Sequence, residues 1–143
     1  MKKITFTING NQLDPKGNPM PYQRTTQGTQ WTDKAVRYQE WKSYVVAQLI
    51  DALDAMPREE RMKYKNLIYI SKGKPIIATN EKIYVNLKIE WKNDTSVRGD
   101  CDNIFKGIAD ALFVNDKYVA GSFDYETSKT NNGKVYVEII WTK

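Results

Sequence analysis

The sequence contains no histidine, a single cysteine and no long apolar run. Without histidine there can be no Ser-His-Asp triad, no Cys-His pair and no histidine general base. One cysteine can build neither a structural zinc site nor an internal disulfide. No run is long enough to cross a bilayer, and the N-terminus lacks the apolar stretch of a secretory signal, so we expect a cytoplasmic protein without membrane contact. The remaining catalytic groups are carboxylates, lysine, tyrosine and hard metal ions.

The charge balance is moderately basic. Lys and Arg total 22 and Asp and Glu total 17, which gives a net charge of +5 and favours a polyanionic partner such as nucleic acid. An ordinary soluble protein with surplus surface lysine has the same balance. A chain of 143 residues with 41% hydrophobic residues predicts one folded domain over residues 1–143.

The first half of the chain predicts a strand, a long loop and a long helix. Residues 4–8 alternate apolar and polar, as in a strand, and residues 9–30 are rich in Asn, Gly, Pro, Gln and Thr. Apolar residues then recur at helical spacing from an N-cap at Asp33 to about residue 56, where Pro57 ends the helix. Trp41 lies on this apolar stripe and is expected in the core.

The second half predicts a sheet with one more helix. A charged connector over 58–65 and a hairpin over 66–79 precede a clear strand of alternating residues. The later elements are expected at residues 83–91 (strand), 103–112 (helix), 122–129 (strand) and 135–141 (strand). Asn131-Asn132-Gly133 between the last two strands is typical of a hairpin turn. The order β-α-β-α-β-β predicts an α+β fold, with a small mixed sheet of about four strands and two helices.

Acidic residues gather where the second helix begins. Asp100 and Asp102 precede it, Lys106 follows one turn later, and Asp116 comes after the helix. In extended chain Asp100 and Asp102 point to one side and Cys101 to the other. Clustered carboxylates repel each other unless a cation neutralises them, and a hard cation such as Mg²⁺ prefers oxygen ligands.

Simpler interpretations exist for single members of this cluster. Asp102 is a possible helix N-cap, and Lys106 with Asp110 forms an ordinary helix ion pair at i,i+4. An EF-hand is excluded, because Phe105 and Ala111 stand where that loop needs Gly and Glu.

The motif resembles the RusA-type Holliday junction endonucleases, which are common in prophages. The residues that carry the resemblance are Asp100-x-Asp102-Asn103-x-x-Lys106-x-x-x-Asp110-Ala111-Leu112, followed by Asn115-Asp116. The first strand, the Pro-containing loop with Arg24, the first helix and the strand before the acids also fit the family. Two features depart from it: residues 57–80 look like an insertion, and the connection from Leu112 to Asp116 is short.

The resemblance implies a homodimeric, Mg²⁺-dependent (or Mn²⁺-dependent) endodeoxyribonuclease that resolves four-way junctions and other branched DNA in recombination and repair. Carried over residue by residue, the metal ligands are Asp100, Asp102 and Asp116, and the essential lysine is Lys106. Asn103 and Asp110 complete the motif as supporting residues. The basic residues expected to meet DNA phosphates are Arg24, Lys92, Arg98, Lys106 and Lys129.

Chain geometry bears on how the acids meet. A helix over 103–112 carries the chain roughly 15 Å, and the three residues before Asp116 can return only about 13 Å. We therefore hypothesise that Asp116 approaches the acidic pair of the partner subunit in a two-fold dimer.

Two alternatives stay open, and a third, phosphoryl transfer on nucleotides, is weaker because the sequence has no Gly-rich phosphate loop. Glu90-Trp91-Lys92 at the end of a strand mimics half of a PD-(D/E)xK nuclease site, although no suitable upstream acid accompanies it. The chain could also be a non-catalytic module that binds branched DNA, in which the acids are caps and surface charge. In the junction-nuclease interpretation, Trp31 and Trp41 could stack on unpaired bases, although Trp41 is expected in the core.

Overall fold

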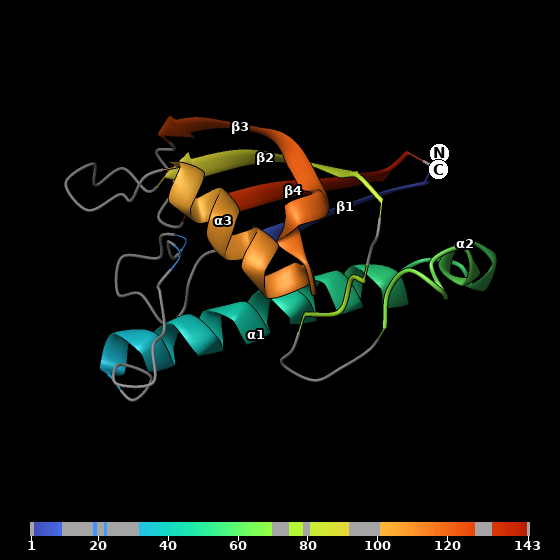
Figure 1. Cartoon of the computed structure of the whole chain (residues 1–143), viewed down its shortest axis with the longest axis horizontal. Coiled ribbons are helices and arrows are strands. Elements are labelled where there is room, and N and C mark those ends of the chain that lie inside the picture. The colour runs from blue at the N-terminus through green and yellow to red at the C-terminus, as the bar shows by residue number, and fades with distance from the viewer. Residues whose placement is uncertain are drawn as a thin grey trace.

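A computed structural model describes residues 2–9, 19, 22, 32–69, 75–78, 81–91, 101–127 and 133–142. In these ranges the elements along the chain are β1 (Lys2–Asn9), α1 (Asp33–Asp54), α2 (Arg58–Met62), β2 (Ile83–Trp91), α3 (Cys101–Leu112), the 3-10 helix η2 (Asp116–Tyr118), β3 (Val119–Thr127) and β4 (Lys134–Trp141). The predicted α+β class is confirmed, and α2 adds a helix where a connector was expected (Figure 1).

The four described strands form one mixed sheet in the order β1-β4-β2-β3. β4 pairs antiparallel with both β1 and β2, while β3 pairs parallel with β2. The predicted hairpin between the last two strands is therefore wrong, because β2 separates them. Burial explains the order: β4 has fully buried Val135 and Ile139 and lies inside the sheet, whereas exposed β3 takes the edge.

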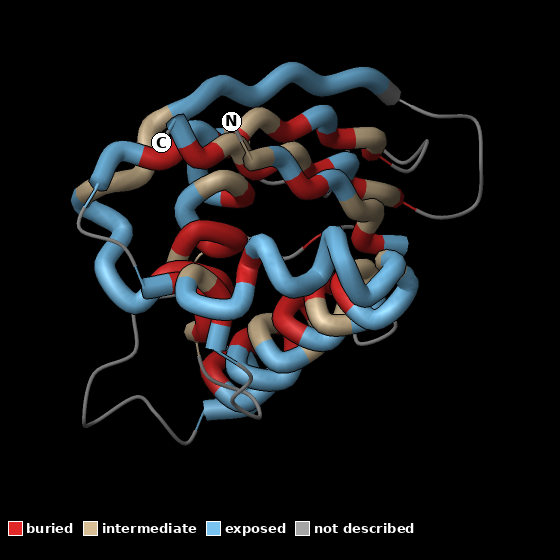
Figure 2. Tube along the Cα trace, turned by 90° about the vertical axis from the view of Figure 1, so that its right-hand side faces the viewer, coloured by how far each residue is buried: buried red, intermediate tan, exposed pale blue. Residues whose placement is uncertain are grey.

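One face of the sheet packs against α1 and α3 (Figure 1), and the buried residues gather between the two layers (Figure 2). Alternation along β2 sends Ile83, Val85, Leu87, Ile89 and Trp91 into this core. Helical spacing on α1 and α3 supplies the facing residues, which include Trp41, Leu49, Ile104 and Ile108. Trp41 is fully buried, so it is a core residue and not a stacking surface.

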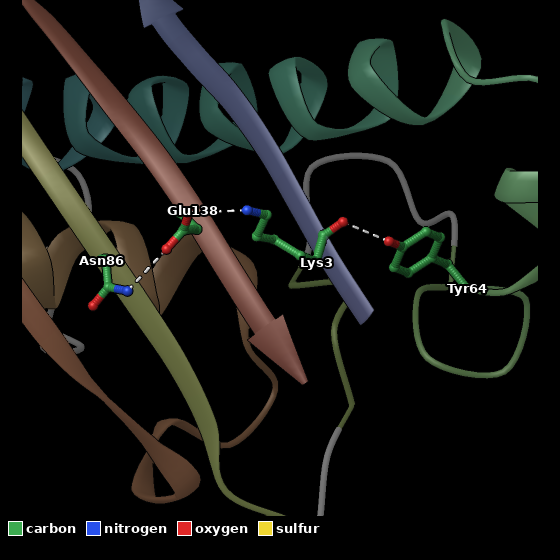
Figure 3. Close-up of polar contacts among 4 residues, drawn as sticks. All are labelled: Lys3, Tyr64, Asn86 and Glu138. Carbon is green, nitrogen blue, oxygen red and sulfur yellow. Dashed lines mark hydrogen bonds and ion pairs between the residues drawn. The ribbon is translucent and has the colours of Figure 1, made fainter. Parts of the chain in front are cut away.

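The opposite face of the sheet carries a row of polar contacts that crosses all four strands. Glu138 on β4 accepts a hydrogen bond from Asn86 Nδ2 at 3.1 Å and pairs with Lys3 Nζ at 3.7 Å (Figure 3). Ser122 on β3 donates to Asn86 Oδ1 at 3.0 Å. These contacts tie neighbouring strands together on the side away from the helices.

The cap of α1 differs by one residue from the expectation. Thr32 is the N-cap, and its side-chain oxygen accepts the N–H of Ala35 at 3.2 Å. Asp33 lies in the first helical turn, where its negative charge is favourable beside the N-terminus of the helix dipole.

The segment after α1 belongs to the core rather than to a surface appendage. Ile68 and Ile77 form an isolated antiparallel bridge, as the predicted hairpin requires, but residues 70–74 of its turn lie outside the described residues. Buried Tyr64 donates to the backbone carbonyl of Lys3 at 2.6 Å (Figure 3). The N–H groups of Ile76 and Ile77 both donate to the carbonyl of Leu112, so this segment closes the C-terminal end of α3.

Candidate active site

The first turn of α3 presents the acidic residue Asp102. The helix begins at Cys101, two residues earlier than predicted, so Asp102 lies in the first helical turn and is neither extended nor the N-cap. The side chain is exposed, and its Oδ1 accepts the N–H of Asn103 at 3.0 Å. The positive end of the helix dipole stabilises a carboxylate here, which explains the early start. Cys101 is half-buried and packs against the core, in keeping with a structural role.

Lys106 lies on the same face of α3 as Asp102, since the two are four residues apart. The side chain is exposed, and its Nζ lies 4.3 Å from the centroid of the Tyr22 ring. The backbone N–H of Tyr22 donates to the carbonyl of Asn103 at 3.0 Å. A residue from the long first loop is thus fixed against the first two turns of α3.

Asp110 does not pair with Lys106, contrary to the simple helix prediction. Asp110 Oδ2 accepts a hydrogen bond from the Tyr38 hydroxyl at 2.8 Å and pairs with Lys42 Nζ at 3.3 Å. Both partners come from α1, so Asp110 joins the two helices. Burial raises the pKa of the Tyr38 hydroxyl well above its ordinary value, and the hydrogen bond to the Asp110 carboxylate raises it further.

Asp116 lies beyond the other end of α3. It is exposed and begins η2, and the preceding residue Asn115 caps this turn by accepting the N–H of Lys117 at 3.3 Å. From Asp102 to Leu112 the axis of α3 advances about 15 Å at about 1.5 Å per residue. The two ends of α3 are well separated in Figure 1. Within the described part of the chain, no group of three or more potential metal-ligating residues comes together.

The family model for endodeoxyribonuclease RusA matches residues 12–140, which is nearly the whole chain. The chain belongs to the RusA endodeoxyribonuclease family. Membership confirms the resemblance drawn from the acidic motif and implies an endodeoxyribonuclease that acts on Holliday junctions. No curated protein matches the chain closely enough to add a second comparison.

Several residues of the predicted RusA site lie outside the described residues. They are Asp100, Arg24, Lys92, Arg98 and Lys129, together with Trp31. Their roles stay predictions. In the alternative nuclease motif, Glu90 lies on β2 and its Oε1 accepts a hydrogen bond from Tyr136 at 3.4 Å.

Three residues that contact Lys106 or Asp110 were not singled out from the sequence: Tyr22, Tyr38 and Lys42. Tyr38 and Lys42 are four residues apart on α1, so the sequence shows that they share a face. It does not show that this face meets Asp110, which follows Tyr38 by 72 positions. No pattern singles out Tyr22 within its loop.

None of the described helices is long and apolar enough to cross a membrane.

Proposed function

We propose that this protein is a metal-dependent, structure-specific endodeoxyribonuclease that resolves Holliday junctions by paired hydrolysis of phosphodiester bonds, in DNA recombination and repair. The proposal rests on two exposed side chains of opposite charge in the first half of α3. There an exposed carboxylate, Asp102, and an exposed cation, Lys106, share one helix face in a chain of the RusA family.

The donor chemistry of the acids fits a hard divalent cation. Asp102 and Asp116 are exposed carboxylates that make no ion pair within the described residues, so their oxygens are available to a ligand. Asp100 comes two residues before Asp102 and adds a third carboxylate. Mg²⁺ and Mn²⁺ both favour oxygen ligands. When bound, such a cation supplies Lewis acidity at the scissile phosphate and lowers the pKa of water.

Lys106 has a distinct part in this scheme. Its ammonium group stabilises negative charge that develops on the phosphoryl oxygens during hydrolysis. Because Lys106 lies one helical turn from Asp102, its side chain would reach a phosphate bound beside Asp102.

The separation of the acids supports a shared site between two subunits. Asp102 and Asp116 of one chain lie at opposite ends of α3, so a single subunit does not bring them together without a partner. We propose that Asp116 of one subunit joins Asp100 and Asp102 of the other across a two-fold axis. Two such sites in one dimer suit paired incisions in a junction with two-fold symmetry.

The basic residues complete the proposed DNA contacts. Arg98 stands next to the acidic pair in sequence, and Arg24, Lys92 and Lys129 are further candidates for phosphate contacts. Such contacts make affinity fall as salt rises, because phosphate neutralisation releases counterions.

A substrate panel tests this function. Labelled four-way junction, fork and linear duplex are incubated with the protein, with and without Mg²⁺. We expect cleavage of the junction only with Mg²⁺, and retained junction binding after the metal is removed with EDTA. Asp102→Asn should lower the cleavage rate about hundredfold or more, because a carboxylate that holds the cation is lost.

Asp33→Asn is the matched control, since Asp33 is also an exposed acid in the first turn of a helix. It should cleave as the wild type does. Binding without cleavage under all metal conditions would support the non-catalytic alternative. Cleavage that survives Asp102→Asn and is abolished by Lys92→Ala would support the PD-(D/E)xK alternative.

A further inference from the structure

We propose that Tyr22 is a positioning residue for Lys106: its ring holds the lysine ammonium ready for a DNA phosphate without neutralising the charge. The inference rests on the proposed function, in which Lys106 acts at the phosphate. It assigns to a loop residue a role that neither the acidic motif nor family membership provides.

The contact itself is a cation–π interaction. Lys106 Nζ lies 4.3 Å from the centroid of the Tyr22 ring, well inside the range in which the ring face attracts a cation. An exposed lysine otherwise samples many rotamers, which lowers the fraction of time that its ammonium points toward a substrate. The ring therefore restricts Lys106 in advance of binding.

Tyr22 is held in place from two sides. Its backbone N–H donates to the Asn103 carbonyl on α3 at 3.0 Å. Its ring meets the ring of Tyr38 on α1 edge to face, with centroids 5.9 Å apart and planes at 81°. Since the first of these contacts is made by the backbone, a change of the Tyr22 side chain leaves that contact available.

The charge of Lys106 is not neutralised by Asp110, because the Asp110 carboxylate contacts other residues. Asp110 is four residues after Lys106, the usual spacing of a helix ion pair. Its carboxylate instead contacts the Tyr38 hydroxyl and Lys42 Nζ. Among the described residues no carboxylate forms an ion pair with Lys106. A carboxylate partner would compete with a phosphate, whereas an aromatic face does not.

The experiment compares Tyr22→Leu with Tyr22→Phe in single-turnover cleavage of a four-way junction with Mg²⁺. Tyr22→Leu, which removes the ring, should slow cleavage about tenfold. Tyr22→Phe keeps the ring and should stay within about twofold of the wild type. Junction affinity without metal should change much less than the cleavage rate in both variants, because Lys106 is one of five basic residues proposed to contact phosphates and the ring does not bind DNA itself.

A double variant separates positioning from general packing. In a Lys106→Ala background, Tyr22→Leu should cause no further loss of rate, because the ring acts only through the lysine. Tyr44→Leu is the matched control: Tyr44 is half-buried, its ring packs on Trp41 and its hydroxyl donates to the Asn9 carbonyl of β1, so its loss should lower stability but leave the cleavage rate unchanged.

An independent measurement uses the wild-type protein. In NMR spectra the ε-methylene protons of Lys106, assigned with Lys106→Arg, should be shifted upfield by the Tyr22 ring relative to other lysines. This readout also covers the case in which Tyr22→Leu does not fold.

Three results would each overturn the positioning role. Tyr22→Leu could cleave at the wild-type rate, or it could slow cleavage as much in the Lys106→Ala background as in the wild type. The third is the absence of the upfield shift of the Lys106 protons. Wild-type cleavage by Lys106→Ala would instead remove Lys106 from the proposed function, and the inference with it.

Discussion

Asp110 makes a polar connection between two helices that otherwise meet through apolar residues. Its Oδ2 accepts from the Tyr38 hydroxyl at 2.8 Å and contacts Lys42 Nζ at 3.3 Å. Tyr38 is almost fully buried, so its hydroxyl needs a partner inside the protein. One carboxylate therefore satisfies a buried donor and balances a lysine.

Tyr38→Phe tests this connection. Losing the hydrogen bond should lower the free energy of unfolding by about 1–2 kcal/mol. Burial and the Asp110 carboxylate raise the pKa of Tyr38 above its unfolded value of 10.0, so the folded chain keeps a proton that the unfolded chain loses. The contribution of Tyr38 to stability is thus complete below that unfolded value and declines as the pH rises above it.

The measurement is thermal unfolding from pH 8 to pH 11. The wild type should lose stability at the alkaline end, and Tyr38→Phe should lose less. Part of the decline persists in the variant, because burial also raises the pKa of Tyr44 and Tyr64. Identical alkaline profiles for the two proteins would show that the Tyr38 contact adds nothing.

Residues of one short motif could be predicted from the sequence, whereas contacts between separate elements could not. Asp102 and Lys106 are recognisable because they belong to one short motif with fixed spacing. The i,i+4 spacing predicted an ion pair between Lys106 and Asp110. Spacing within one helix gives no information about Tyr38 and Lys42 on α1, which are the partners that Asp110 has. The contact between Tyr22 and Lys106 depends on a loop that returns to α3, which no periodicity reveals.

At the scale of elements, the pairing of β3 with β2 brings the backbones of Gly121 and Val85 very close together. Gly121 pairs with Val85 and has φ of 155°, a backbone conformation that side chains rarely adopt. A Cβ at this position would overlap the carbonyl oxygen of Val85. The close approach of the two strands thus depends on glycine.

Gly121→Ala should therefore destabilise the fold by about 1–3 kcal/mol, since the alanine needs a strained backbone or a displaced strand. Urea unfolding measures the difference. Asp124→Ala, an exposed change in the same strand, should stay within about 0.5 kcal/mol of the wild type. Equal stability of Gly121→Ala and Asp124→Ala would mean that β3 tolerates a side chain at residue 121.

Most elements could be predicted from periodicity alone, because a strand or helix buried on one face repeats its apolar residues regularly. β2 is the clearest case, with alternation from Ile83 to Trp91 that matches the observed bounds. Strand partners were harder to predict. The Asn-Gly turn predicted a hairpin, but the placement of β4 inside the sheet depends on burial by α1 and α3, which lie far away in sequence.

At the scale of the whole molecule, the exposed acids occupy two ends of one helix. Asp102 is in the first turn of α3, and Asp116 begins the turn that follows it. In a dimer in which Asp116 reaches the first turn of the partner subunit's α3, both ends of each α3 contribute acids. Such a dimer has two equivalent sites. We propose that these acids from two subunits serve one hydrolytic site.

Mixed subunits test this claim most directly. Asp102→Asn and Asp116→Asn proteins, each expected to be inactive alone, are combined into heterodimers and assayed on a four-way junction with Mg²⁺. If the site is shared, one of the two sites in each heterodimer carries both changes and the other carries none. We predict that the heterodimer recovers cleavage at one strand of the junction, whereas a heterodimer as inactive as its two parents would contradict the shared site.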